Sequence, residues 1–311
     1  MSLDTDKLIE RRRQRRSALL WKVMATLSLT ALIAVLVMRT VAPDNGLAGG
    51  QLFDGAHIAR VQISGIILED RFRDKMLKEL KDDDKVKAVL IEINSPGGTV
   101  VGGENLYLGL KDLASKKPVV AVMGSTATSA AYMTAIGADR IFARNGTLTG
   151  SIGVILQTAD LTELMDKIGM KPVTIKSGEL KAQPNPLESL SPAARKHMQD
   201  VVMDMYDLFV GMVAERRNMD VDAVKKLADG RVFTGQKALD AGLIDAIGGE
   251  AEAILWLETE KSLEADLRVV DEKPDYPRPD VVERVFGAVG KALVSERLTL
   301  DGLLAVWQPE L

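Results

Sequence analysis

The sequence contains no cysteine in its 311 residues. This absence excludes disulfide bonds, thiolate metal sites and a cysteine nucleophile. A free thiol is a liability in an oxidising compartment, so a chain without cysteine is compatible with export from the cytoplasm. Any catalysis by this protein therefore depends on hydroxyl, amine, carboxylate, imidazole or backbone groups.

Histidine is almost absent as well, since His57 and His197 are the only two in the chain. His57 lies at the entry to the first expected strand, and His197 lies among charged residues on an expected long helix. Neither is well placed to activate a serine. Without an H-x-x-x-H pattern, a Walker A loop or a complete dinucleotide fingerprint, we expect no metal and no cofactor.

The chain also lacks an excess of positive charge. Its formal net charge is −4 and its isoelectric point is about 5.5. These values do not suggest the basic surface that nucleic-acid binding requires, so we expect no nucleic-acid partner. Apolar residues make up 46% of the chain, which is ample for a packed core.

The first forty residues contain a long apolar run. Residues 11–16 read RRRQRR, and a charge interrupts the apolar residues 17–38 only at Lys22. About 21 residues at ~1.5 Å each span roughly the hydrocarbon core of a bilayer. Since only Arg39 follows the run directly, the charge bias places the N-terminus in the cytoplasm. We therefore predict a cytoplasmic basic segment over 1–16, a transmembrane helix over 17–39 and a linker over 40–56.

A cleaved signal peptide is the alternative for this N-terminus. The apolar core of a signal peptide is shorter, typically about 7–15 residues. Pro43 follows Ala42 directly, so no A-x-A cleavage site stands after the run, and there is no lipobox cysteine. These features favour a retained anchor.

Beyond residue 57, short apolar runs alternate with helical patterns. Strands are expected at 58–67, 86–93, 118–124, 139–143, 151–156 and 171–178. Helices are expected at 69–84, 98–117, 161–170, 191–218 and 221–230. This alternation predicts an α/β fold with mostly parallel strands. We expect the folded domain over 57–265 and, after a proline-rich edge, a C-terminal tail with an amphipathic helix over 266–311.

Two segments offer groups for a hydrolytic site. Residues 94–98, NSPGG, follow an expected buried strand, and their backbone N–H groups suit an oxyanion hole. Residues 124–133, GSTATSAAYM, place serine at the start of a helix, where the helix dipole stabilises negative charge. Taken alone, the first segment is explained better by an ordinary tight turn, and the second by an N-cap or by close helix packing.

A serine nucleophile in this chain needs a base other than histidine. Residues 175–181, IKSGELK, place Lys176 and Lys181 in a polar loop after an expected strand. Loop lysines are usually solvated charges. Desolvation in an apolar site nevertheless lowers a lysine pKa by up to several units, so a Ser-Lys dyad is physically available.

The order of these segments resembles the signal peptide peptidase A family of bacterial serine proteases. NSPGG, GSTATSAAY, TGSIGVI, IKSGELK and ADGRVFTGQKALDAGLIDAIGG follow one another in the family's order. Each motif is weak alone, but their order and spacing together are specific. The likeness covers residues 58–257 and implies a core fold similar to the Clp protease and crotonase superfamily, with a repeated ββα unit.

The resemblance implies a role for five residues. The family's nucleophile falls on Ser129 and its general base on Lys181, rather than on Lys176. Its oxyanion-hole glycine falls on Gly98, with the N–H of Ala130 as a second donor. Ser151 matches a serine that orients the base lysine through a hydrogen bond. The segment 230–235, GRVFTG, is expected to be structural.

One departure from the family concerns the two residues after the nucleophile. Family members usually have Gly-Gly there, whereas this chain has Ala130 and Ala131. Alanine is strained where the backbone needs a positive φ, but it suits the first turn of a helix. We expect the helical arrangement.

The resemblance also implies a function. We expect a serine endopeptidase anchored in the bacterial inner membrane by one helix, with its protease domain on the extracytoplasmic side. Its expected substrates are cleaved signal peptides and other hydrophobic peptides, and it is expected to be a homo-oligomer. Two alternatives stay open: a non-enzymatic membrane scaffold, and a crotonase-like acyl-CoA enzyme.

Overall fold

The computed structural model describes residues 21–22, 24–28, 55–276 and 303–306. The chain forms two compact units, Met1–Ala48 with Pro277–Ser295 and Gly49–Tyr276 with Glu296–Leu311. In the first unit, residues 21–22 and 24–28 are helical; the rest of the expected transmembrane helix and the basic segment lie outside the described residues. None of the helices in the described ranges has the length and apolar character needed to cross a membrane.

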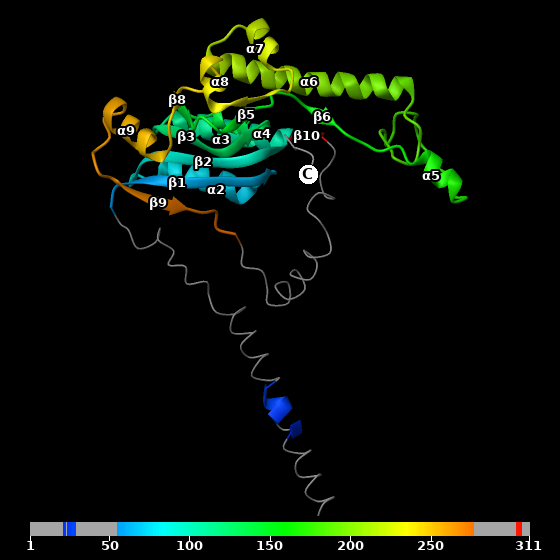
Figure 1. Cartoon of the computed structure of the whole chain (residues 1–311), viewed down its shortest axis with the longest axis horizontal. Helices are drawn as coiled ribbons and strands as arrows, with labels where there is room; N and C mark the ends of the chain where they lie inside the picture. Colours follow the sequence, from blue (N-terminus) through cyan, green and yellow to red (C-terminus); the bar gives the residue numbers. More distant parts are fainter. Residues whose placement is uncertain (1–20, 23, 29–54, 277–302, 307–311) are drawn as a thin grey trace, which may run out of the picture. The chain divides into compact units, whose positions relative to one another are not determined.

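The second unit is built on a parallel-dominated sheet (Figure 1). Its described strands are β1 (His57–Ile67), β2 (Val86–Thr99), β3 (Val119–Thr128), β4 (Arg140–Ala143), β5 (Leu148–Gly150), β6 (Ile155–Leu156), β7 (Val232–Thr234), β8 (Ala246–Ile247), β9 (Arg268–Glu272) and β10 (Leu303–Val306). Strands β9, β1, β2, β3, β4 and β8 pair in parallel in that order. Strand β5 continues beside β3 in parallel, whereas β7 and β10 pair antiparallel. The predicted α/β class with mostly parallel strands is confirmed.

Helices cover both faces of this sheet. They are α2 (Arg71–Asp82), α3 (Val100–Ala114), α4 (Ala130–Ala135), α5 (Thr162–Lys167), α6 (Pro192–Arg217), α7 (Val221–Leu227), α8 (Gly235–Asp240) and α9 (Glu250–Glu260). Alternate residues of β2 enter different cores: Val89 and Ile91 pack with residues of α2, α3, α4 and α6, whereas Ala88 and Leu90 pack with α9. The strand is therefore apolar on both faces, as a central parallel strand must be.

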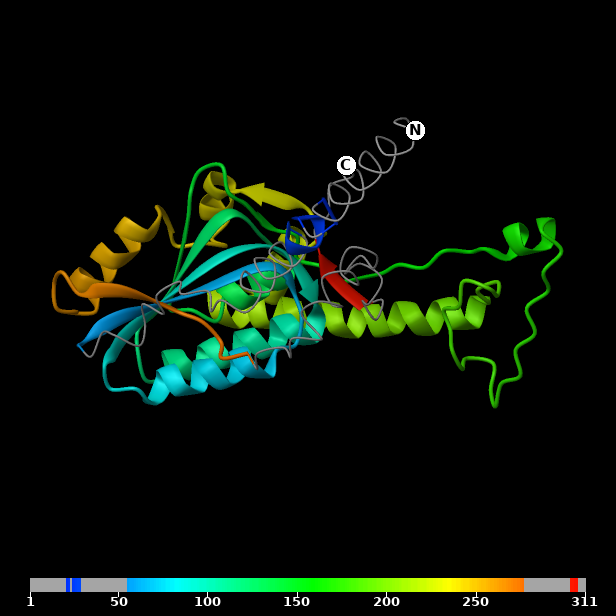
Figure 2. The same cartoon turned by 90° about the horizontal axis from the view of Figure 1, so that it is seen from below.

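Helix α6 is only partly attached to this core. Its Ser191 side chain caps the helix, with Pro192 at the first position, as the sequence predicts. Phe209, Val210 and Val213 are buried near its C-terminal end, whereas most of its N-terminal half is exposed. Figures 1 and 2 show this half projecting beyond the sheet together with residues 157–190, which we call the arm.

The structure corrects the expected strand at 171–178. These residues form no strand, and the side chains of Val173 and Ile175 are 87% and 98% exposed. Apolar β-branched residues at this position lack a neighbouring strand with which to pair. The pattern predicts strand propensity correctly, but propensity alone does not supply the partner.

Three further expectations about segment ends are corrected. Residues 94–98 continue β2 rather than forming a separate turn, since β2 runs to Thr99. Part of the expected C-terminal tail joins the sheet: β9 pairs with β1, and β10 pairs with β2. Residues 303–306 are thus a strand and not a helix. The remaining residues expected to form the amphipathic helix lie outside the described residues.

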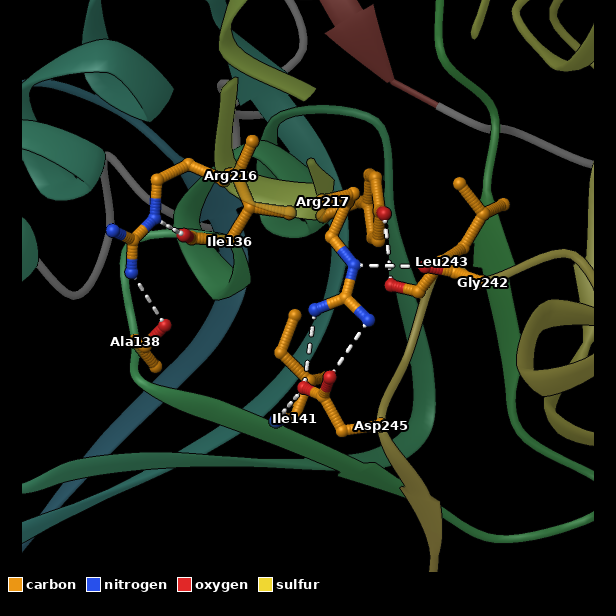
Figure 3. A network of polar contacts seen from close by, with 9 residues as sticks. Ile136, Ala138, Ile141, Arg216, Arg217, Gly242, Leu243 and Asp245 are labelled. Carbon is orange, nitrogen blue, oxygen red and sulfur yellow. Dashed lines mark hydrogen bonds and ion pairs between the residues drawn. The ribbon is translucent and has the colours of Figure 1, made fainter. Parts of the chain in front are cut away.

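Arg216, near the end of α6, holds the C-terminal end of α4. Its Nε donates to the carbonyl of Ile136 at 2.7 Å, and its Nη2 donates to the carbonyl of Ala138 at 2.9 Å (Figure 3). Ile136 is the C-cap of α4, where backbone acceptors lack helical partners, and Ala138 lies two residues beyond it. The charged donor therefore fixes α4 against α6.

Arg217 forms the neighbouring contact. Its guanidinium makes two bonds to the Asp245 carboxylate, at 2.8 and 3.1 Å, and Asp245 also accepts from the N–H of Ile141 at 2.8 Å (Figure 3). Burial acts to lower the pKa of Arg217, but the bonds and charge of Asp245 outweigh it and raise that pKa. The ion pair ties α6 to β4 and to the segment before β8.

We expect Arg217→Leu to destabilise the folded domain, because the substitution leaves Asp245 unpaired in a largely buried site. The loss should be about 2 kcal/mol or more, measured as a lowered thermal unfolding midpoint of the full chain. Lys196→Ala is the control, because it breaks an exposed pair at 3.5 Å. Its effect should stay below about 0.5 kcal/mol. Equal losses in the two variants would contradict the assigned role.

Candidate active site

Ser129 lies where β3 ends and α4 begins. Its backbone has φ 59° and ψ −121°, a conformation that non-glycine residues rarely adopt. The N–H of Ser129 donates to the carbonyl of Gly150 at 2.8 Å, and its carbonyl accepts from the N–H of Met133 at 2.9 Å. The side chain does not cap α4, and the residue is 1% exposed. A sharp strand-to-helix turn thus presents a hydroxyl group at the positive end of a short, fully buried helix.

The expected oxyanion segment lies beside this turn. The Thr128 hydroxyl group donates to the carbonyl of Pro96 at 3.0 Å, and Ser95 pairs with Ala127 across β2 and β3. A side chain at Gly98 would place its Cβ 1.8 Å from the carbonyl oxygen of Ile67. Only glycine fits there, because the backbone of β1 occupies the space that a side chain at this position of β2 would need.

Ser151 is brought next to Ser129. Strands β3 and β5 pair with Thr128 opposite Gly150, and Ser151 follows Gly150 with φ 50°. The N–H of Ser151 donates to the carbonyl of Arg231 at 2.8 Å. The two serines therefore leave adjacent strands at the same edge of the sheet, each through a backbone conformation that is costly for a non-glycine residue.

The segment 230–235 supports this edge from outside. Its strand β7 pairs antiparallel with β5, with Val232 opposite Gly150. A Cβ at Gly150 would lie 2.6 Å from the ring of Phe233. The segment thus packs against the residue that accepts the Ser129 N–H, which agrees with the structural role expected for it.

Ala130 and Ala131 are the first two residues of α4. Both are completely buried, and neither belongs to the residues with positive φ. The positive φ falls on Ser129 instead. Alanine therefore fits here as an ordinary helical residue, and the prediction that the Ala-Ala pair begins a helix is confirmed.

Lys181 lies in the arm, in a turn without regular secondary structure. Its side chain is exposed and, among the described residues, has no hydrogen-bond or ion-pair partner. Within the described part of one chain, no hydrogen bond joins it to Ser129 or Ser151. Lys176 differs, because its ammonium group forms an ion pair with Glu188. Of the expected site residues, the fold gathers Ser129, Ala130, Gly98 and Ser151 at one edge and leaves Lys181 on the arm.

The histidines lie away from this edge. His57 pairs with Val86 and Arg268, the first residues of β2 and β9, so it lies at the amino ends of the parallel strands. Ser129 follows the carboxyl end of β3. His197 is exposed on the projecting half of α6. In the described ranges, no group of three His, Asp or Glu residues is arranged to hold a metal ion.

Strand β10 runs antiparallel to the last residues of β2. Ala305 stands opposite Gly98 and Leu304 opposite Thr99, and β6 pairs on the other side of β10. An extended segment of polypeptide thus lies between β2 and β6, directly beside the expected oxyanion glycine.

Sequence reasoning missed Gly150. Its carbonyl accepts the N–H of Ser129, and its φ of 80° requires glycine or a strained residue. The signal was the glycine in front of Ser151 in TGSIGV, since a glycine between a strand and a buried serine is typical of a positive φ.

Comparisons with known proteins identify the family of this chain. The family model described as peptidase family S49 matches residues 111–264. The protein named "Putative protease slr0021" from Synechocystis is 41% identical over 232 residues, covering 74% of this chain and 83% of that protein. "Putative signal peptide peptidase SppA" from Enterococcus faecium is 41% identical, covering 64% of this chain and 58% of that protein. "Serine protease SPPA, chloroplastic" from Arabidopsis thaliana is 33% identical, covering 83% of this chain and 40% of that protein.

Two solved structures are also similar. A mutant of ClpP1 from Listeria monocytogenes has a TM-score of 0.41 and 20% identity, covering 62% of this chain and 92% of that one. A mutant of the 1510-N membrane-bound stomatin-specific protease has a TM-score of 0.45 and 16% identity, covering 72% of this chain and 100% of that one. On the family model and the curated relatives, this chain belongs to peptidase family S49, the signal peptide peptidase A family of serine peptidases.

Proposed function

We propose that this chain is a membrane-anchored serine endopeptidase with a dyad of Ser129 and Lys181. The observation that carries the proposal is the position of Ser129, which stands at a strained strand-to-helix turn beside the carboxyl end of β2. Strain held at a buried hydroxyl residue is typical of functional sites. The protease names of the relatives support the same reaction class.

The proposed chemistry is acyl transfer to Ser129. Neutral Lys181 takes the proton from the Ser129 Oγ, which attacks the carbonyl carbon of the scissile peptide bond. The N–H groups of Gly98 and Ala130 stabilise the oxyanion. The lysine then gives its proton to the leaving amine. In the second half, the lysine takes a proton from the water that attacks the acyl-enzyme and returns it to the Ser129 Oγ as the acid product leaves. Ser151 orients the amine of Lys181.

The contacts of the two candidate lysines favour Lys181 as the base. Lys176 donates to the Glu188 carboxylate, so its amine is already engaged. The amine of Lys181 has no such partner within the described residues. A lysine whose amine is held by a carboxylate is not free to accept a proton from a serine hydroxyl group.

A second copy of the chain completes the site in this proposal. The arm that carries Lys181 exposes a set of large apolar side chains: Leu164, Ile168, Met170, Val173, Ile175, Leu180 and Leu187. Exposed apolar surface of this extent is typical of an interface. Packing the arm against a neighbour buries it, favours the neutral amine, and brings Lys181 to the neighbour's Ser129. The homo-oligomer is thus part of the proposed mechanism.

The proposed substrates are cleaved signal peptides and similar hydrophobic peptides. The position of β10 supports an extended peptide beside β2, because a backbone strand fits between β2 and β6. Main-chain hydrogen bonds to a sheet edge bind peptides of many sequences. In this proposal the peptide runs past Gly98 in the place that Ala305 occupies.

The proposed location is the bacterial inner membrane, with the N-terminus in the cytoplasm and the protease domain on the extracytoplasmic side. The arginines of residues 11–16 and the apolar run over 17–38 support it. A domain held close to the membrane meets signal peptides that remain there after export.

We expect Ser129→Ala to abolish cleavage of a fluorogenic hydrophobic peptide by the full-length protein, lowering kcat/KM by about 10⁴-fold or more. Lys181→Ala should lower kcat/KM by about 10²- to 10⁴-fold through loss of the base. Lys171→Ala is the control, as Lys171 is another exposed lysine of the arm. An inactive wild-type protein, or full activity in both site variants, would refute the protease proposal and favour the scaffold.

Mixing the two inactive variants tests the shared dyad. In assemblies formed by co-expressing Ser129→Ala and Lys181→Ala chains, random pairing leaves about one quarter of sites with both groups intact. Peptide cleavage should therefore return to about one quarter of the wild-type rate. If mixed assemblies are isolated and stay inactive, each chain supplies its own base.

A further inference from the structure

Two side chains of the arm meet at the carboxylate of a third, Glu188. Glu188 Oε2 forms an ion pair with Lys176 Nζ and accepts from Gln183 Nε2 at 2.9 Å. The side chains of Lys176 and Glu188 are 14% and 25% exposed, in a segment that is otherwise mostly exposed. We call Lys176, Gln183 and Glu188 the Glu188 cluster.

In the sequence, Lys181 lies between two members of the Glu188 cluster. Lys176 precedes Lys181 and Gln183 follows it, and both bind the same oxygen of Glu188. The intervening backbone contacts are short turns, from the N–H of Lys181 to Gly178 at 3.1 Å and from the N–H of Gln183 to Leu180 at 3.4 Å. Glu188 therefore ties both ends of the turn that carries Lys181.

The backbone directly after Lys181 is strained. Ala182 has φ 59°, in the left-handed region that disfavours alanine by roughly 1–2 kcal/mol. Such a conformation persists only where surrounding contacts hold it. The bond from Gln183 to Glu188 is the side-chain contact adjacent to this residue. The cluster thus holds a defined backbone at Lys181, in a loop without helix or strand.

The charged groups of the cluster give Lys176 and Lys181 different partners. Hydrogen bonds from Lys176, then from Thr174 and Gln183, lower the pKa of Glu188, so its carboxylate is ionised at neutral pH. This carboxylate engages Lys176 and leaves the amine of Lys181 without a partner among the described residues.

We propose that Glu188 is a positioning residue: it closes the loop around Lys181 and occupies Lys176, so that only the amine of Lys181 is presented to a serine. This inference rests on the proposed role of Lys181 as general base. It predicts that the rate of chemistry, and not the binding of peptide, depends on a carboxylate that touches neither the peptide nor Ser129.

Glu188→Gln in the full-length protein tests the inference, because it keeps the shape of the side chain and removes its charge. We expect kcat for the fluorogenic peptide to fall about 10-fold, with KM changed by less than about twofold. Glu179→Gln is the matched control, since Glu179 is an exposed carboxylate of the same loop. It should keep the wild-type kcat. A wild-type kcat in Glu188→Gln would overturn the inference.

Lys176 provides a second comparison that does not depend on Glu188→Gln folding. Lys176→Arg keeps the ion pair and should keep kcat within about threefold of wild type, whereas Lys176→Met should lose about 10-fold. Thermal unfolding midpoints of the two variants should agree within about 2 °C, which separates positioning from global destabilisation. Equal kcat values for the two variants would contradict the role of the ion pair.

Lys181→Ala separates failure of the inference from failure of the proposed function. If Lys181→Ala is inactive while Glu188→Gln keeps full activity, the dyad stands and the positioning role falls. If Lys181→Ala keeps full activity, Lys181 is not the base and both proposals fall. Loss of activity in Lys181→Ala with reduced kcat in Glu188→Gln supports both.

Discussion

The hydrogen bond from the N–H of Ser129 to the carbonyl of Gly150 is the contact on which the candidate site depends. It extends the parallel pairing of β3 and β5 by one residue beyond Thr128. After this contact, the backbone leaves each strand through a residue with positive φ, Ser129 after β3 and Ser151 after β5. One register of two strands thus sets the place of both serines, and a shift by one residue would turn their side chains to opposite faces.

This arrangement contains strain that the core must offset. Ser129 and Ser151 each occupy the left-handed region at a cost of order 1 kcal/mol or more. The helix that follows Ser129 is completely buried, and Arg216 holds its far end. A turn that is held from both sides cannot relax to an ordinary conformation without displacing β5 or α6, and this rigidity keeps the hydroxyl group in place.

The two halves of the proposed dyad differ in how they are held. Ser129 is fixed by the sheet, whereas Lys181 is carried by an arm whose local order comes from a few turns and from one carboxylate, Glu188. The arm and the first half of α6 expose apolar residues, which a single chain leaves in water. A site divided in this way is active only when the arm is packed, so assembly and activity become linked in the proposed mechanism.

Several elements could be predicted from local patterns. Continuous apolar runs predicted β1, β2 and β3, and the Ser191–Pro192 pair predicted the start of α6, because these signals reside in neighbouring residues. The strand predicted at 171–178 was wrong for the opposite reason. A strand needs a neighbouring strand with which to pair, and the local sequence does not show whether one is present. Gly150 was missed because its role depends on Ser129, which is distant in sequence.

The class of fold, the exclusion of thiol chemistry and the family all follow from the amino-acid sequence, because composition, periodicity and the order of short motifs are properties of the chain alone. Three features emerge only from the folded chain: the serine whose N–H binds Gly150, the fit of Ala130 and Ala131 in a helix, and the lysine that pairs with Glu188. These are contacts between residues of different segments. Their geometry follows from strand register and packing, which no single segment encodes.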